Sequence, residues 1–385
     1  MSDIVRLGVI GIGNMGKYHL SYLNSGDMKN CEVTAVCDID ERQIKDLDPK
    51  YKKFTDSKEL IRSGEVDAVI ISTPHYDHTT IGIDAFENNL HVLVEKPISV
   101  HKADCERLIA AAKAHPDKKF TAMFQMRTEP VYKKIKQLIT TGEIGEIRRI
   151  NWIATFWFRS EAYYKSGGWR ATWSGEGGGV LLNQSPHNLD MWQWLFGMPA
   201  KVRSFLGIGK YHDIEVEDDV TTYMEYANGA TALFTTTTGE YPGTNRLEIT
   251  GERGLLLLED GKLTMKRNEV ETTEFSKTTP NGFSTPEFWN VEIPIRGKGG
   301  AHKEITQNFI NAILYGEELL APAEEGINSV ELANAMIYSH FTDSTVEMPL
   351  DGAAYEAKLK ELIASSTYVK EVVESKEVDM NASFK

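Results

Sequence analysis

Two residues far apart in the chain have side chains that suit proton transfer and charge stabilisation at a hydroxyl group. Lys96 follows a short apolar run, and His187 follows three consecutive glycines. A histidine can take a proton near neutral pH, and a lysine ammonium favours the alkoxide-like form of a hydroxyl as its carbon loses hydride. Asn183 stands four residues before His187, a spacing that places both on one face of a helix, and its amide can bond sugar hydroxyls. The alternatives are a surface ion pair between Lys96 and Glu95 and a helix-start histidine held by backbone.

A glycine-rich turn between a strand signal and a helix signal predicts a dinucleotide site. Residues 11–16 read GIGNMG and directly follow an apolar run. The first glycine permits a tight turn, the second lets the backbone approach a pyrophosphate, and the third lets helix and strand pack. Gly11, Gly13 and Gly16 in this context therefore predict that a dinucleotide binds at the turn.

Asp38 ends the second strand signal, 22 residues after Gly16. A carboxylate at this point accepts hydrogen bonds from the ribose hydroxyls of NAD and repels the 2′-phosphate of NADP. The sequence therefore favours NAD, and NADP is the alternative because Arg42 is close enough in sequence to reach a phosphate.

Polar residues also follow the next strand signal at the same expected sheet edge. Thr73 and Pro74 come directly after the apolar run AVIIS, and ligands of doubly wound sheets bind at the carboxyl ends of the strands. His75 and His78 lie three residues apart, but no nearby cluster supplies the further ligands that a metal needs. We therefore predict no metal site, with His78 as a cap or packing residue of the following helix.

The elements that must position these residues change character along the chain. Up to about residue 120, strand signals alternate with helix signals, which predicts a parallel sheet of βαβ units. The expected strands are Arg6–Ile12, Glu32–Asp38, Ala68–Ser72, Leu90–Val94 and Phe120–Phe124. The expected helices are Met15–Ser25, His78–Asn88 and Val100–Ala114, the last capped by Ser99.

The middle of the chain contains strand signals without helices between them, which predicts an antiparallel sheet. Asn228–Gly229 and Asp260–Gly261 are expected hairpin turns, because type I′ turns need positive φ. The expected strands are Arg148–Phe158, Val220–Tyr226, Ala230–Thr238, Asn245–Thr250, Gly254–Glu259 and Lys262–Lys266, and the later helices are His302–Tyr315, Ile327–His340 and a charged tail from Asp351.

Length and composition restrict the kind of protein. The chain has 385 residues, and its 42 basic and 56 acidic side chains give a formal charge of −14. Such a chain repels phosphate backbones and anionic lipid, so we expect no nucleic-acid or membrane partner. Three cysteines without a CxxC pair, no apolar run of membrane-spanning length and no signal-peptide pattern predict a cytoplasmic protein.

Taken together, these motifs resemble the Gfo/Idh/MocA oxidoreductase family. The resemblance runs through GIGNMG, TPHYDH, EKP, MFQMRTEPVY and WRATWSGEGGGVLLNQSPHNLD, within most of residues 4–345. It implies an α/β fold with a doubly wound Rossmann domain over residues 1–125 and an α/β domain with a large, mostly antiparallel open sheet over residues 126–350, followed by a helical tail over residues 351–385.

The resemblance also implies roles for individual residues. Lys96 matches the family's catalytic lysine and His187 its acid/base histidine. The positions that match the family's cofactor contacts are Gly11, Ile12, Gly13, Asn14, Met15, Gly16, Asp38, Thr73, Pro74, His78, Glu95, Lys96, Gln125, Trp169 and Arg170. This chain departs from the family in having Asn183 where an aspartate is common and His75 where an asparagine is usual.

The resulting prediction is an NAD-dependent dehydrogenase that oxidises a ring hydroxyl of a sugar, glucoside or cyclitol to a ketone. His187 would take the hydroxyl proton, Lys96 would polarise the oxygen, and Asn183 would orient the substrate. The alternatives are a glycosidase that uses NAD for transient oxidation and a non-catalytic nucleotide-binding sensor. Strands with apolar residues on both alternations predict a homo-oligomer, dimer or tetramer, formed through the second sheet.

Overall fold

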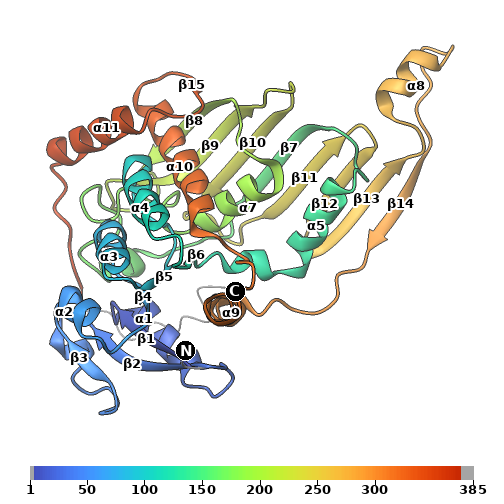
Figure 1. Ribbon diagram of the computed structural model, residues 1–385. Coiled ribbons are helices and arrows are strands. Elements are labelled where there is room, and N and C mark those ends of the chain that lie inside the picture. The colour runs from blue at the N-terminus through green and yellow to red at the C-terminus, as the bar shows by residue number, and fades with distance from the viewer. Residues whose placement is uncertain (1–3, 374–385) are drawn as a thin grey trace.

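The computed structural model describes residues 4–373 and contains two sheets that lie side by side (Figure 1). The first has six strands in the order β3-β2-β1-β4-β5-β6, and every neighbouring pair is parallel. This is the strand order of a doubly wound dinucleotide-binding fold. Its strands are β1 (Val5–Ile10), β2 (Cys31–Cys37), β3 (Lys52–Phe54), β4 (Ala68–Ile71), β5 (His91–Val94) and β6 (Phe120–Ala122).

Helices pack against both faces of this sheet, which explains why β4 is apolar and buried at every position. They are α1 (Asn14–Leu23), α2 (Ser57–Arg62), α3 (His75–Glu87), α4 (Lys102–Ala114) and, from much later in the chain, α9 (Ala301–Tyr315). The sequence did not predict β3 or α2, whose few residues have no periodicity. It also placed the start of α3 three residues late and named the wrong cap for α4, since His101 and not Ser99 accepts the hydrogen bond of its first turn.

The second sheet has nine strands in the order β14-β13-β12-β11-β7-β10-β9-β8-β15. All pairs are antiparallel except β10 with β7, so the sheet is mixed and mostly antiparallel. Its strands are β7 (Ile147–Ala154), β8 (Lys201–Ile208), β9 (Glu217–Glu225), β10 (Thr231–Thr237), β11 (Asn245–Gly251), β12 (Gly254–Glu259), β13 (Lys262–Asn268), β14 (Phe288–Ile293) and β15 (Val346–Glu347).

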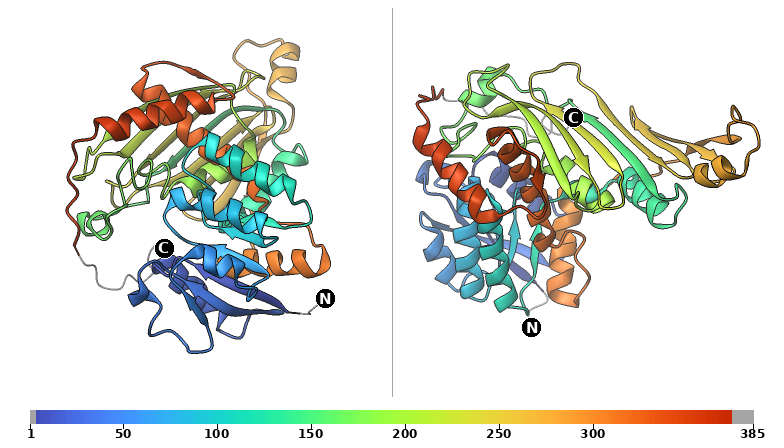
Figure 2. Two further views of the ribbon diagram at one scale, coloured as in Figure 1. Left: turned by 60° about the vertical axis from the view of Figure 1, so that its left-hand side comes forward. Right: turned by 90° about the horizontal axis from the view of Figure 1, so that it is seen from above.

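Helices cover one face of the nine-stranded sheet, as the view from above shows (Figure 2). They bury Trp152, Trp192 and Phe234 in one aromatic core, and no helix of residues 4–373 lies on the opposite face. The helices of this half are α5 (Pro130–Thr140), α6 (Glu161–Lys165), α7 (Pro186–Phe196), α8 (Thr272–Thr278), α10 (Gly326–Phe341) and α11 (Gly352–Ser365). Short 3₁₀ turns are η1 (Glu41–Gln43) between β2 and β3, η2 (Gln125–Thr128) before α5 and η3 (Ala323–Glu325) before α10.

The predicted hairpins form, but only one has the expected turn type. Asp260 and Gly261 both have positive φ, as a type I′ turn requires. At the other hairpin only Gly229 has positive φ, so the turn containing Asn228 is not type I′.

The expected helical tail is shorter than predicted. Helix α11 ends at Ser365, and residues 366–373 continue without helix. The rest of the predicted tail, residues 374–385, lies outside the described residues. Helix α9 packs on the first sheet although it follows the second in sequence, and the domain boundaries at 125 and 350 stay predictions.

Candidate functional site

A crevice of about 890 Å³ lies at the carboxyl ends of β1, β2, β4 and β5 and is walled on its far side by loops of the second half. Ligands bind at this edge in doubly wound sheets. The predicted site residues that line it are Gly11, Gly13, Asn14, Met15, Asp38, Thr73, Pro74, His78, Glu95, Lys96, Trp169, Arg170, Asn183 and His187.

Three predicted residues do not line the crevice. Ile12 is fully buried among apolar side chains below the turn. A Cβ on Gly16 would lie 2.0 Å from the carbonyl oxygen of Gly11, so this glycine serves helix packing. Gln125 is buried in η2, beyond the crevice wall.

The glycine turn leaves room for a bound group at one position. Gly11 has φ +89°, and a Cβ there would lie 2.8 Å from the backbone of Ser72 and Thr73. Gly13 caps α1, and a Cβ on it would meet nothing within 4 Å. Gly13 lines the crevice, so the first turn of α1 offers its backbone N–H groups to a pyrophosphate, and the turn fits a dinucleotide.

Asp38 shapes this turn as well as facing the crevice. Its Oδ2 accepts a hydrogen bond of 2.7 Å from the N–H of Ile12, and its Oδ1 accepts one of 2.9 Å from the N–H of Asp40. A carboxylate has about four acceptor positions. Asp38 can therefore hold the turn and still accept from ribose hydroxyls.

The loops after β4 and β5 are tied together by His78. Its Nδ1 lies 2.8 Å from the carbonyl oxygen of Pro97 and its Nε2 2.9 Å from that of Thr73. The hydroxyl of Thr73 is buried and has no hydrogen-bond partner among the described residues. It thus offers an acceptor or donor to a group bound in the crevice.

Lys96 does not form the surface ion pair with Glu95 that the sequence left open. The carboxylate of Glu95 lies 2.8 Å from His19 Nε2, while Lys96 Nζ donates a 2.7 Å hydrogen bond to the backbone oxygen of Asn183. Burial lowers the pKa of Lys96 to about 8, although the charges of Glu95 and Glu176 oppose the shift. At mildly alkaline pH, Lys96 is thus present both as the ammonium and as the neutral amine.

His187 is the second residue of α7 and stacks on Trp157, with ring centroids 5.9 Å apart. Its Nδ1 is buried and has no hydrogen-bond partner among the described residues. Burial lowers its pKa well below the ordinary value, and the charge of Lys96 adds to this. The ring is therefore neutral at pH 7 and has a nitrogen that can accept a proton.

Asn183 and His187 do not share a helix, contrary to the expectation from their spacing. Helix α7 begins at Pro186, and Asn183 lies in the preceding turn. Its Oδ1 accepts hydrogen bonds from Tyr163 at 3.2 Å and Gln184 at 3.1 Å, and its Nδ2 donates to Glu176. One N–H of the amide is left for a substrate.

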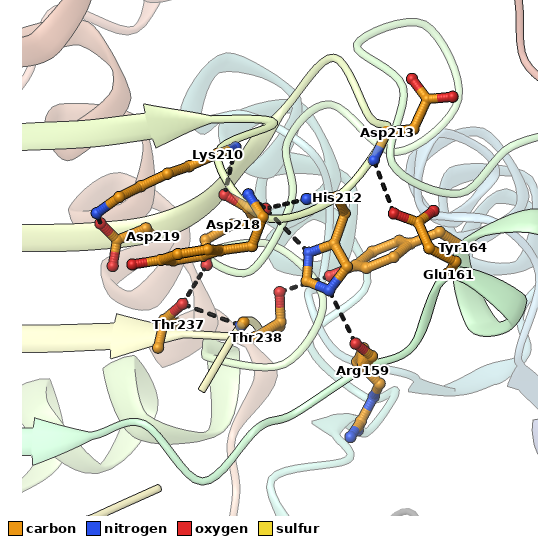
Figure 3. Close-up of polar contacts among 12 residues, drawn as sticks. Arg159, Glu161, Tyr164, Lys210, His212, Asp213, Asp218, Asp219, Thr237 and Thr238 are labelled. Carbon is orange, nitrogen blue, oxygen red and sulfur yellow. Dashed lines mark hydrogen bonds and ion pairs between the residues drawn. The ribbon is translucent and has the colours of Figure 1, made fainter. Parts of the chain in front are cut away.

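The segment that carries Arg159 and Tyr163 to the crevice is held by a half-buried histidine, His212 (Figure 3). His212 Nδ1 lies 2.9 Å from Asp218 Oδ2, and its Nε2 lies 2.9 Å from the backbone oxygen of Arg159. Both oxygens only accept, so the doubly protonated ring is the form that can donate to both. Burial opposes this charge, but the Asp218 hydrogen bond and the Arg159 carbonyl raise the pKa of His212.

Several residues of the wall were not predicted. Arg159, Gln184 and His302 line the crevice, and Glu176 lies behind it. Trp173 is buried against Phe341 and does not line the crevice. These residues lie in loops or, for His302, on a helix from the far end of the chain, so no local pattern marks them.

No group of three or more His, Cys, Asp or Glu side chains within residues 4–373 is placed to hold a metal ion. In the same part of the chain, no helix has the length and apolar character needed to cross a membrane.

Comparison with protein families gives two matches that together span both halves of the chain. Residues 5–123 match the model described as "Oxidoreductase family, NAD-binding Rossmann fold". Residues 132–257 match the model described as "GFO/IDH/MocA C-terminal domain".

Individual relatives agree with these matches. An inositol 2-dehydrogenase from Salmonella typhimurium is 33% identical over 146 residues, which cover 37% of this chain and only 43% of that protein. Inositol 2-dehydrogenase 2 from Paenarthrobacter aurescens is 26% identical over 353 residues, covering 89% of this chain and 97% of that protein. The WlbA dehydrogenase from Chromobacterium violaceum, solved with NADH and UDP-GlcNAcA, superposes with a TM-score of 0.77 at 25% identity, covering 91% of this chain and 97% of that one.

Proposed function

The chain belongs to the Gfo/Idh/MocA family of oxidoreductases, and we propose that it is an NAD-dependent dehydrogenase of a sugar, glucoside or cyclitol. One observation carries the proposal. Lys96 and His187, 91 positions apart in the chain, line the same crevice as the glycine turn. The reaction would convert a ring CH–OH group to a ketone. The names of the inositol 2-dehydrogenases, and the NADH and UDP-GlcNAcA bound to the WlbA dehydrogenase, support this substrate class.

NAD, when bound, would supply nicotinamide C4 as the hydride acceptor. Gly13 and the first turn of α1 would hold its pyrophosphate, Asp38 its ribose, and Thr73 would offer its buried hydroxyl at the loop after β4. The carboxylate of Asp38 disfavours a 2′-phosphate, so NAD is expected to be preferred over NADP.

The proton would go to His187. Its imidazole is neutral because burial lowers its pKa, so it can accept the hydroxyl proton as the C–H bond transfers its electron pair. The ammonium of Lys96 would stabilise the negative charge on the oxygen. The remaining N–H of Asn183 would donate to a neighbouring hydroxyl of the substrate. The new C=O bond forms as hydride leaves, so the electrons balance.

The open face of the second sheet supports assembly into a homo-oligomer. Ile153, Tyr223 and Leu233 on this face are each about 40% exposed or more, and Phe205 is 60% exposed. Tyr223 and Leu233 are cross-strand neighbours. Apolar side chains gathered on an uncovered sheet face favour an interface between copies of the chain.

The proposed function is tested by incubating the protein with NAD⁺ and a panel of cyclitols, aldoses and glucosides while NADH absorbance is recorded. Accumulation of NADH with at least one compound is the expected result. A protein that releases the aglycone from a glucoside without NADH would be a glycosidase instead. A protein that binds NADH but does neither would be a sensor.

A further inference from the structure

One buried carboxylate beside the crevice has no role in the reaction just described. Glu176 lies in the glycine-rich loop before α7 and is 1% exposed. Its Oε2 accepts a 2.6 Å hydrogen bond from the N–H of Ala171, and its Oε1 accepts one from the side-chain amide of Asn183. Burial raises its pKa, and the charges of Arg170 and Lys96 oppose that shift. A buried carboxylate held between two donors and two cations is costly to place without a function.

The bond to Asn183 links Glu176 to Lys96. Because the carboxylate only accepts, it fixes the amide with Nδ2 toward Glu176 and Oδ1 toward the donors on Tyr163 and Gln184. The backbone oxygen of the same asparagine accepts from Lys96 Nζ at 2.7 Å. Displacing the Asn183 side chain would therefore move the acceptor that holds the lysine.

Glu176 also acts on Lys96 through charge. Of the charges that act most strongly on the lysine, Glu95 and Glu176 favour its protonated form, and Arg159 and Arg170 disfavour it. Glu95 is shared with His19. Removing the charge of Glu176 would leave the ammonium less compensated in a desolvated site.

We propose that Glu176 and Asn183 act as one carboxylate–carboxamide pair that positions Lys96 and balances its charge. The proposal rests on the proposed function for the meaning of Lys96. Glu176 is a positioning residue, since it acts through Asn183 and by charge and does not line the crevice. The pair requires one acid and one amide, whichever position holds the acid.

The two single variants should therefore disturb the pair in opposite ways: one removes its only acid, and the other adds a second acid. Glu176→Gln removes the charge. The N–H₂ group of the glutamine must then face either the N–H of Ala171 or the side-chain amide of Asn183, and both of these are donors. Asn183→Asp places two carboxylates within hydrogen-bond range, so one of them must hold a proton. In the double variant Glu176→Gln/Asn183→Asp, the new glutamine can accept from the N–H of Ala171 and donate to the new aspartate, which restores one acid and one amide.

The test compares these three variants with the wild type by the pH dependence of kcat with the best sugar of the panel, and by urea unfolding. Each single change is expected to lower kcat about 10- to 100-fold, the usual value of one hydrogen bond to a charged group. Glu176→Gln should also move the alkaline limb of the pH profile to lower pH, because the less compensated ammonium of Lys96 loses its proton more readily. The double variant should have a higher kcat than either single variant, although it lacks the amide N–H that would donate to the substrate, and its unfolding midpoint should lie above those of both single variants.

Glu331→Gln is the matched control. Glu331 is a buried carboxylate that accepts from Lys102 and from the N–H of Leu350, away from the crevice. Its substitution should lower the unfolding midpoint and leave kcat and the pH profile unchanged. A general loss of stability is thereby separated from loss of the pair.

Losses in kcat or midpoint that simply add in the double variant would overturn the pair, as would single variants that behave like the wild type. Failure of the proposed function looks different. If no compound of the panel reduces NAD⁺, the unfolding midpoints still decide whether the two positions are coupled, and additive midpoints would overturn the proposal on their own.

Discussion

Replacing Asp38 should change the choice between NAD and NADP. Asp38→Asn removes the charge that faces the ribose 2′ position and keeps one side-chain oxygen for either the N–H of Ile12 or that of Asp40. Asp38→Ala removes both acceptors. The first variant therefore tests charge, and the second adds the loss of support for the glycine turn.

The size of the change follows from the position of the carboxylate. Two like unit charges about 5 Å apart repel by about 1 kcal/mol at the permittivity of water and by about 3 kcal/mol at an effective value of 20. Asp38 is half-buried, which places it between these limits. The preference for NAD should therefore fall by about 5- to 150-fold in Asp38→Asn. Each lost backbone acceptor should lower the free energy of unfolding by about 1–3 kcal/mol, so Asp38→Ala is the less stable variant.

The assay is kcat/KM with each cofactor at saturating sugar, together with the dissociation constants of NADH and NADPH measured by protein fluorescence. Asp84→Asn is the control, because Asp84 pairs with Arg62 and does not line the crevice. Its preference should equal that of the wild type. A wild type that uses NADP as well as NAD, or an unchanged preference in Asp38→Asn, would refute the reasoning.

Four other changes test separate parts of the structure. His187→Ala should lower kcat about 10²- to 10⁴-fold, the usual value of general acid–base catalysis, with NADH affinity unchanged in a fluorescence titration. Glu217 is fully buried, and burial raises its pKa to about 7. Because the folded state holds this proton more tightly, the free energy of unfolding should fall by ~3 kcal/mol as the pH rises from below 4.5 to about 7, and urea titrations of Glu217→Gln should lack this decline. His212 has a raised pKa, so its pairing with Asp218 should stabilise the fold fully at pH values below the ordinary histidine pKa and weaken as the pH rises through its own pKa. His212→Gln should remove that dependence from thermal unfolding, whereas an unaltered pH dependence would contradict a protonated ring. Leu233→Asp should convert an oligomer to a monomer in light scattering, and a wild type that is already monomeric would refute the interface.

The sequence predicted the part of the site that local chemistry determines. A glycine turn after a buried strand leaves few conformations open, and parallel strands bring their carboxyl ends to one edge. Asp38, Thr73 and Lys96 could therefore be placed together from strand signals alone.

The prediction failed where a tertiary contact or a single residue decides the backbone. The spacing of Asn183 and His187 suggested one helix, but α7 begins at Pro186, because a proline is favoured in the first turn of a helix, where its missing N–H is not needed. The dipeptide at Ser185 and Pro186 was the available signal. Glu176 carries no such signal, because its partners are brought to it only by the fold.

The same limit applies to the sheets. The turns at Gly229 and Gly261 marked their hairpins, but β8 and β15 pair across more than 140 residues, and no local pattern indicates such pairing. The parallel pairing of β10 with β7 was also absent from the expectation of an antiparallel sheet.

The central claim is that Lys96 and His187 act together while a ring carbon of the substrate gives up hydride. The most direct measurement uses the best sugar of the panel, deuterated at its ring carbons, and follows both NADH absorbance and the mass of the nicotinamide product. The account predicts that net NADH accumulates and carries deuterium, and that Lys96→Ala and His187→Ala each slow its formation while still binding NADH. A product without deuterium, or a His187→Ala protein with near-normal kcat, would contradict it.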